Sequence, residues 1–121
     1  MDKNLINEVN RLHAEICGGL SDPKRILILY ALSVKPTNVT DLSLDLDTPQ
    51  PTISRNLKVL KSHNLVSAKR DGKHVVYQIT DIRIIQALDL LRGLLTDNLK
   101  KQAVLIQSIK TESLGIKESI K

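Results

Sequence analysis

The side chains best suited to chemistry lie in residues 49–60, and the chemistry is hydrogen bonding to nucleic acid. Ile53, Leu57 and Leu60 recur at the i, i+4, i+7 spacing that places apolar side chains on one buried face of a helix. The opposite face then carries hydroxyls and positive charge, from Thr52, Ser54, Arg55 and Lys58. Hydroxyls approach phosphates closely, and an arginine fork matches the O6/N7 edge of guanine. The pattern favours a helix that reads the major groove, although an ordinary amphipathic surface helix carries similar residues.

The segment before this helix predicts a helix-turn-helix. Residues 39–46 are apolar enough, and long enough, to form the preceding helix. The turn between the two helices contains Thr48-Pro49, and we expect this pair to cap the second helix.

The segment after the helix predicts a β-hairpin. Two runs rich in β-branched residues, 65–70 and 73–79, flank Asp71-Gly72, and a two-residue Asp-Gly loop is a strong hairpin signal. A helix-turn-helix followed by such a hairpin is a winged helix, in which the hairpin, or wing, contacts an adjacent minor groove or the backbone. The alternative is a solvated hairpin whose charges only prevent edge pairing. The predicted basic tip consists of Lys69, Arg70, Lys73 and His74.

Two further helices are expected near the N-terminus. Residues 5–16 place apolar side chains on one helical face, and Gly18-Gly19 should stop that helix. Asp22 can cap the next helix, whose segment 26–32 is apolar nearly all round and should form the buried centre. The predicted fold class is therefore mainly α with a small β-hairpin, a winged helix-turn-helix.

The last helix is predicted over residues 81–110, within one domain over residues 1–110, and residues 111–121 should be a flexible C-terminal tail. This helix and the first have more apolar surface than one winged helix can cover, which predicts a homodimer through both helices. An intrachain hairpin that folds the last helix back is the alternative. The predicted dimer interface consists of Leu5, Val9, Leu12, Ile16, Leu88, Leu91, Leu95 and Leu99.

Residues 12–95 resemble the arsenic-repressor type (ArsR/SmtB) of prokaryotic winged-helix transcriptional repressors. The resemblance is carried by the segments 20–29 (LSDPKRILIL), 50–60 (QPTISRNLKVL), 64–66 (NLV) and 70–73 (RDGK). It implies a symmetric dimer that occupies an imperfect palindrome in double-stranded DNA and blocks transcription until an inducer lowers its affinity. It also implies that Gln50 and its neighbours face DNA. The complete predicted DNA-binding set is Gln50, Thr52, Ser54, Arg55, Asn56, Lys58, Lys69, Arg70, Lys73 and His74.

The sequence departs from this family's usual metal sites. Asn38 and Thr40 stand where the arsenic and cadmium sensors carry a Cys-x-Cys pair, and neither is a soft-metal ligand. The last helix contains no histidine, and its carboxylates alone would form a weak zinc site. We therefore predict no metal site and no cofactor.

One pair of metal-ligand types remains, His13 and Cys17, at i, i+4 on the first helix. A redox- or metal-responsive regulator that uses this pair is an alternative. Cys17 lies beside the apolar stripe, however, where a free cysteine usually behaves as a small buried hydrophobe. His63 is expected at the end of the recognition helix, where a cation suits the helix dipole.

Composition agrees with a polyanionic partner: the 121-residue chain has a net charge of +5 and a pI near 9.5. The near absence of aromatic residues argues against single-stranded nucleic acid, which is held by stacking. We expect a cytoplasmic protein without a membrane segment, and no enzyme, since no phosphate loop or nucleophile with a spaced base is found. The inducer, if the protein has one, is not identified by the sequence. A winged-helix protein-interaction module is the alternative function.

Overall fold

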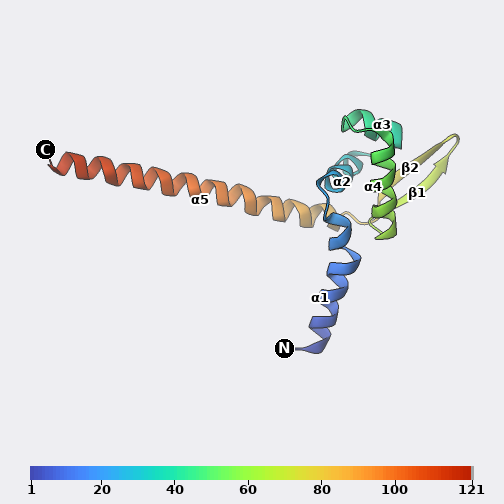
Figure 1. Cartoon of the computed structure of the whole chain (residues 1–121), viewed down its shortest axis with the longest axis horizontal. Coiled ribbons are helices and arrows are strands. Elements are labelled where there is room, and N and C mark those ends of the chain that lie inside the picture. The colour runs from blue at the N-terminus through green and yellow to red at the C-terminus, as the bar shows by residue number, and fades with distance from the viewer. Residues whose placement is uncertain (121) are drawn as a thin grey trace. The chain divides into compact units, whose positions relative to one another are not determined.

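The computed structural model describes the backbone of residues 1–120 and the side chains of residues 1–110. It confirms a mainly helical fold with one β-hairpin (Figure 1). The elements in chain order are α1 (Lys3–Glu15), the short 3₁₀ helix η1 (Cys17–Leu20), α2 (Pro23–Val34), α3 (Val39–Asp45), α4 (Gln50–Ser62), β1 (Val66–Asp71), β2 (His74–Ile79) and α5 (Arg83–Ile120). Residue contacts divide the chain into two units, residues 1–85 and residues 86–121. The first unit holds the winged helix.

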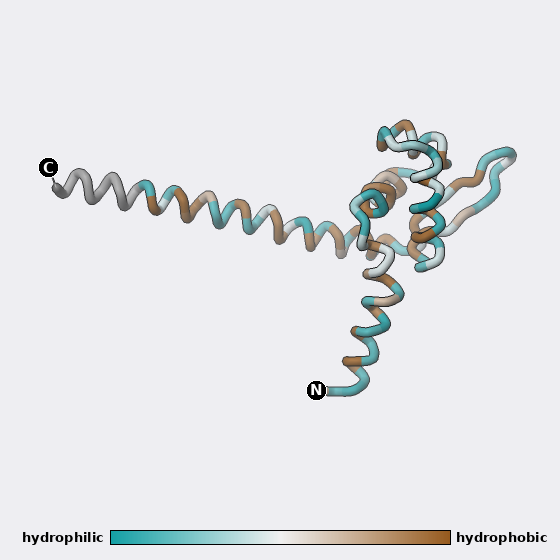
Figure 2. The backbone as a smooth tube through the Cα atoms, viewed as in Figure 1, coloured by the Kyte–Doolittle hydropathy of each residue, from teal (hydrophilic) through white to brown (hydrophobic). Residues whose placement is uncertain are grey.

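The core of the first unit forms where α2 packs against α3, α4 and β2, and where α4 packs against α3 and β1. Apolar side chains with almost no exposed surface come from each of these helices and from the start of β1. They are Ile28, Leu29, Leu32, Leu42, Ile53, Leu57, Leu60, Leu65 and Val66. The segment 26–32 thus supplies the buried centre as expected, but it is not buried all round, because Leu27 is exposed. Figure 2 shows hydrophobic residues gathered on α2 and alternating with hydrophilic ones along α1 and α5.

Local hydrogen bonds fix the ends of the helices that carry the site. The Asp22 carboxylate accepts the backbone N–H of Lys24 at 2.8 Å with Pro23 in the first turn, which confirms the predicted start of α2. Asn38 caps α3 by accepting the backbone N–H of Asp41 at 2.8 Å. Both caps satisfy backbone donors that a helix start leaves unpaired.

The end of α4 is closed by a Schellman motif. The backbone N–H of Leu65 donates to the carbonyl of Leu60, and that of Asn64 donates to the carbonyl of Lys61, both at 3.0 Å. Asn64 has a φ of 58°, in the left-handed region that asparagine tolerates better than most residues. The tight stop places β1 directly beside α4.

The wing is antiparallel, with Val66 opposite Ile79 and Asp71 opposite His74. The two-residue loop is therefore Gly72-Lys73, one residue later than the predicted Asp71-Gly72. Gly72 has a φ of +60° at the first loop position, where a type II′ hairpin requires glycine. The pairing register decides this shift, since it extends β1 through Asp71.

The first helix ends earlier than predicted. α1 stops at Glu15, and Gly18-Gly19 lie inside η1 rather than forming the stop. A Cβ at Gly19 would lie 2.6 Å from Leu65 Cδ1 and 3.2 Å from His63 Cβ, so a larger residue here would displace the side chains packed against it. The chain therefore approaches the core closely through a 3₁₀ turn instead of continuing the helix.

The last helix continues beyond the predicted end at Lys110, since α5 runs to Ile120. Whether residues 111–121 behave as a flexible tail stays a prediction, because their side chains lie outside the described residues. None of the described helices combines the length and apolar content needed to cross a membrane.

Apolar side chains are exposed along α1 and α5 in the single chain. Leu5, Val9 and Leu12 of α1, and Ile16 directly after it, are each 40–51% exposed, and Leu91, Leu95 and Leu99 of α5 are 57–67% exposed. Leu88 differs from the rest of the predicted interface, because it is only 6% exposed without any partner chain. The interface stays a prediction, and Leu88 has little exposed surface to add to it.

Candidate nucleic-acid interface

The outer face of α4 is the centre of the candidate site. Ile53, Leu57 and Leu60 are fully buried on its inner face, so the helix is held in one rotational setting. The exposed side chains on the outer face are Gln50, Ser54, Arg55 and Lys58, and Thr52 is half-buried beside them. The predicted separation of buried and exposed faces is therefore observed, with the exception of Asn56.

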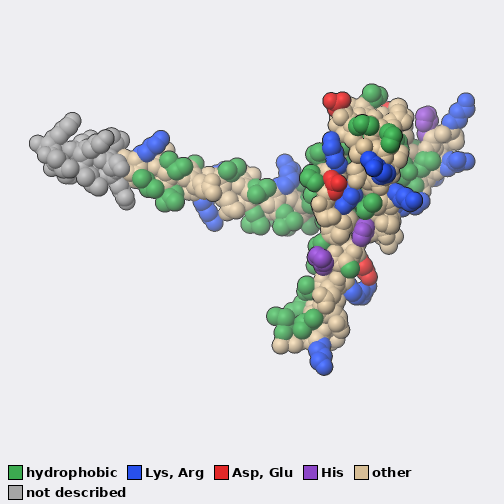
Figure 3. Space-filling model, in the orientation of Figure 1, with side chains coloured by type: hydrophobic (Ala, Val, Ile, Leu, Met, Phe, Trp, Pro, Cys, Tyr) green, Lys and Arg blue, Asp and Glu red, His purple; other side chains and the backbone are tan. Residues whose placement is uncertain are grey.

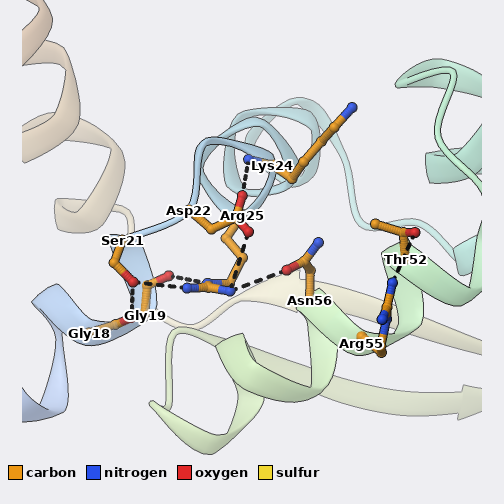
Figure 4. A network of polar contacts seen from close by, with 9 residues as sticks. All are labelled: Gly18, Gly19, Ser21, Asp22, Lys24, Arg25, Thr52, Arg55 and Asn56. Carbon is orange, nitrogen blue, oxygen red and sulfur yellow. Dashed lines mark hydrogen bonds and ion pairs between the residues drawn. The ribbon is translucent and has the colours of Figure 1, made fainter.

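Asn56 is buried, being 8% exposed, and its Oδ1 accepts a hydrogen bond from Arg25 Nη1 at 3.2 Å. Its side chain points toward α2 (Figure 4). The expectation that Asn56 faces DNA is therefore corrected, because its carbonyl oxygen already holds a partly buried guanidinium from the core side.

Arg25 is the residue that joins three elements, and sequence reasoning missed it. Its Nε donates to the carbonyl of Gly19 at 2.8 Å, its Nη2 donates to Ser21 Oγ at 3.0 Å, and its Nη1 reaches Asn56. An ion pair with Asp22, at 3.8 Å, completes the network drawn in Figure 4. The guanidinium thereby fixes η1 and the first turn of α2 against the recognition helix.

Thr48 does not cap α4, which corrects the expected role of Thr48-Pro49. Its Oγ1 donates to the carbonyl of Leu46 and accepts from Lys24 Nζ, both at 2.9 Å. The N-cap is Pro49, which makes no side-chain cap; instead its carbonyl accepts the backbone N–H groups of Thr52 and Ile53. Because Thr48 is turned toward α2, the start of α4 is positioned by tertiary contacts.

Arg55 is presented on the exposed surface of α4. Its Nη2 donates to Thr52 Oγ1 at 3.3 Å, one helical turn earlier, as Figure 4 shows. This bond holds the guanidinium close to the helix surface and leaves most of its donors available. An arginine in this position can present two parallel N–H groups to guanine.

The wing carries the remaining predicted cations. Lys69, Arg70, Lys73 and His74 are all exposed at or near its tip. A surface hollow of about 310 Å³ lies on the hairpin, lined by Lys69, Arg70, Asp71, Val76 and Gln78. Four of these five residues carry a charged or amide side chain, and Val76 is the exception.

The cations on the outer face of α4 and on the wing form no ion pair with a described carboxylate. Among the side chains that the structure describes, no ion pair joins a carboxylate to Arg55, Lys58 or the basic residues of the wing. Figure 3 shows Lys and Arg side chains over α4 and at the wing, with few acidic side chains on the same face. Asp45 and Asp47, at the end of α3 and the following turn, are exposed without pairing to those cations. The surface thus has the charge that a duplex requires.

His13 and Cys17 do not share a regular helix, because α1 ends between them. Cys17 is exposed in the single chain, so the core of this chain does not bury it as the small hydrophobe that was expected. Over residues 1–110, no group of three or more His, Cys, Asp and Glu side chains is arranged to hold a metal ion. His63 caps the end of α4, and its Nδ1 lies 2.9 Å from the carbonyl oxygen of Glu15. Since a carbonyl only accepts, the imidazole donates there and links α1 to α4.

A helix-turn-helix with an exposed cationic second helix and a basic wing defines a winged helix protein of the DNA-binding kind. Residues 22–68 match the family described as bacterial regulatory protein, arsR family. The HTH-type transcriptional regulator Rv0081 of Mycobacterium tuberculosis, which is uncharacterized, is 30% identical over 101 residues, covering 83% of this chain and 89% of that protein. Its crystal structure gives a TM-score of 0.69 over 78% of this chain and 96% of that chain. The chain belongs to the arsR family of bacterial regulatory proteins.

The chain is also similar to one further regulator in sequence and to one further solved domain in structure. The HTH-type transcriptional regulator NmtR of Mycobacterium tuberculosis is 37% identical over 70 residues, which are 58% of this chain and 58% of that protein. The match thus spans little more than half of NmtR. A homodimeric winged helix-turn-helix DNA-binding domain from Mycobacterium bovis, a possible ArsR-family transcriptional regulator, gives a TM-score of 0.69 at 23% identity, covering 82% of this chain and 91% of that chain. At this level of sequence identity, the similarity to the Mycobacterium bovis domain shows a shared fold.

Proposed function

We propose that this protein is a sequence-specific, double-stranded-DNA-binding transcriptional regulator that acts as a homodimeric repressor in the cytoplasm. The observation that carries the proposal is the outer face of α4. There Arg55 and Lys58 are exposed and unpaired with any described carboxylate, on a helix that its buried inner face holds in place. Such a helix fits the width of the major groove.

The proposed roles follow from side-chain chemistry. Arg55 reads a base edge with the help of Gln50, because a guanidinium fork and an amide both form paired hydrogen bonds with bases. Thr52, Ser54 and Lys58 hold phosphates, which fixes the register of the helix without reading sequence. The wing, through Lys69, Arg70, Lys73 and His74, contacts the adjacent backbone.

The partner proposed for the exposed apolar stripes of α1 and α5 is a second copy of this chain. Leaving so many leucines in water would favour aggregation, and a two-fold pairing covers them on both chains at once. The stripe on α5 continues past Leu99 with exposed Leu105, Ile106 and Ile109, so the proposed interface includes this later part of the helix. A two-fold dimer places two α4 helices about one DNA turn apart, roughly 34 Å, which makes the operator a palindrome.

Repression follows from occupancy, because a dimer seated on an operator excludes other proteins from that DNA. The proposal assigns no metal and no cofactor to the chain. Any inducer of the protein would be a small molecule that lowers the affinity of the dimer for its operator.

The experiment is a selection of the purified protein on random duplex DNA at about 0.15 M salt, where non-specific phosphate binding is already weakened. The expected result is an enriched palindrome whose half-sites are about 10 base pairs apart. The Arg55→Ala variant, selected in parallel, should lose the enrichment at the half-site positions. A folded dimer that enriches no sequence would overturn the proposal and favour a winged-helix module that binds protein.

A further inference from the structure

Lys24 is a cation held beside the recognition helix but not on it. It lies in the first turn of α2, and its Nζ donates to Thr48 Oγ1 at 2.9 Å. Thr48 is only 4% exposed and is itself fixed by the carbonyl of Leu46 and by Ser43, whose Oγ donates to the Thr48 carbonyl. The ammonium therefore sits at a fixed point on the turn that leads into α4.

The charge of Lys24 is not neutralised by the carboxylate closest to it in sequence. Asp22 receives the backbone N–H of Lys24 through Oδ1, while its Oδ2 lies 3.8 Å from the Arg25 guanidinium. Among the described side chains, no carboxylate forms an ion pair with the Lys24 ammonium. An ammonium group has three donors, and the bond to Thr48 uses one of them.

The position of this ammonium suits a phosphate rather than a base. Lys24 and Arg25 place the first turn of α2 alongside the first half of α4, since Lys24 reaches Thr48 and Arg25 reaches Asn56. Because Thr48 lies in the turn before α4, a cation held there would be nearer to the phosphates at the edge of the groove than to the base edges inside it. Lysine binds phosphate as a point charge, so an anchored ammonium loses little further freedom on binding.

We propose that Lys24 binds a phosphate of the DNA backbone at the edge of the groove that α4 enters, with Thr48 as the residue that positions its ammonium. This assignment rests on the proposed function, because it requires that α4 be the helix facing DNA. It adds a contact from α2, outside both the recognition helix and the wing. One such contact per subunit would fix how deeply the start of α4 enters the groove.

The test is the salt dependence of duplex binding for Lys24→Gln, since the glutamine amide can still donate to Thr48 Oγ1 but carries no charge. The matched control is Lys35→Gln, which removes a lysine at the opposite, C-terminal end of α2. Lys24→Arg keeps the charge. Binding of each protein to the selected palindrome and to random duplex is measured by fluorescence anisotropy between about 0.05 and 0.3 M salt, with thermal unfolding followed in parallel.

We expect Lys24→Gln to weaken binding to both duplexes and to lower the slope of log K against log salt concentration by about one per subunit. Lys35→Gln and Lys24→Arg should keep the wild-type slope. A wild-type slope for Lys24→Gln on a duplex that the wild type binds would overturn this assignment and leave the proposed function intact, even if affinity fell through a change in the turn. If the wild type binds no duplex, the proposed function fails and this assignment fails with it.

Discussion

Nη1 of Arg25 and Oδ1 of Asn56 lie 3.2 Å apart and join the first turn of α2 to the middle of α4. The hydrogen bond runs between residues 25 and 56, from the core side of the recognition helix. It holds α4 by a polar contact where the rest of that inner face is apolar. The orientation of the residues proposed to face DNA therefore depends on Asn56, whose own side chain is turned toward the core.

Replacing Asn56 with Ala should lower the free energy of unfolding by about 1–3 kcal/mol, because the Arg25 guanidinium loses a partner in a partly buried place. Urea unfolding followed by circular dichroism measures this change. The control is Lys61→Ala on the same helix, where an exposed side chain should alter stability by less than about 0.5 kcal/mol. Unchanged stability together with an altered base preference would mean that Asn56 contacts DNA.

Replacing Arg55 with Ala should cost about 1–3 kcal/mol of binding free energy on the selected palindrome and much less on random duplex. The reason is that a base-reading guanidinium contributes mainly to the correct sequence. Competition binding with both duplexes measures the difference. Equal losses on the two would assign Arg55 to a phosphate instead.

Replacing Lys73 with Ala should weaken binding to all duplexes alike and lower the salt slope by about one per subunit. Lys73 is the exposed second residue of the wing loop, and its proposed partner is a phosphate, which lysine binds as a point charge. Anisotropy titrations over a salt series measure the slope. A loss confined to the palindrome would show that the wing reads sequence.

Replacing Leu95 with Asp should raise the dissociation constant of the proposed dimer about a hundredfold or more, because two buried leucines are lost from each two-fold interface. Leu95 is 66% exposed in the single chain. Leu90, at 76%, is five residues earlier and so lies on another face of α5, which makes Leu90→Asp the matched control. Sedimentation velocity over a concentration series distinguishes monomer from dimer. Similar behaviour of the two variants would contradict the proposed interface.

Asp81 should titrate well below other exposed carboxylates, because its side-chain hydrogen bonds with Arg83 lower its pKa to about 2. The folded pKa lies below the unfolded value of about 3.9. The contribution of this pair to folding is therefore present above the unfolded value and is lost as the pH falls through the folded one. A carboxyl ¹³C NMR titration of the wild type and of Arg83→Gln measures it, and the substitution should return the pKa of Asp81 toward its ordinary range. An ordinary pKa in the wild type would contradict the observed contacts.

The sequence by itself determined the elements of this protein. The spacing of Ile53, Leu57 and Leu60 predicts both the recognition helix and its buried face, and Gly72 between β-branched runs predicts the wing. Each of these signals lies within one turn of helix or one hairpin. Local periodicity and turn chemistry act over such distances, so they can be recognised without knowledge of the fold.

The tertiary structure alone decided what individual polar residues do. In the sequence, Asn56 lies among the residues predicted to face DNA, but its side chain is turned inward and accepts a hydrogen bond from Arg25. Thr48 is of a residue type that commonly caps helices, but its hydroxyl accepts a hydrogen bond from Lys24 instead of capping α4. These partners are 31 and 24 residues distant along the chain. A polar side chain that could form several local hydrogen bonds instead bonds to a partly buried polar group, because leaving that group without a hydrogen bond costs free energy. The hydrogen-bond partners of Asn56 and Thr48 come from α2, so they are determined only when α2 packs against α4.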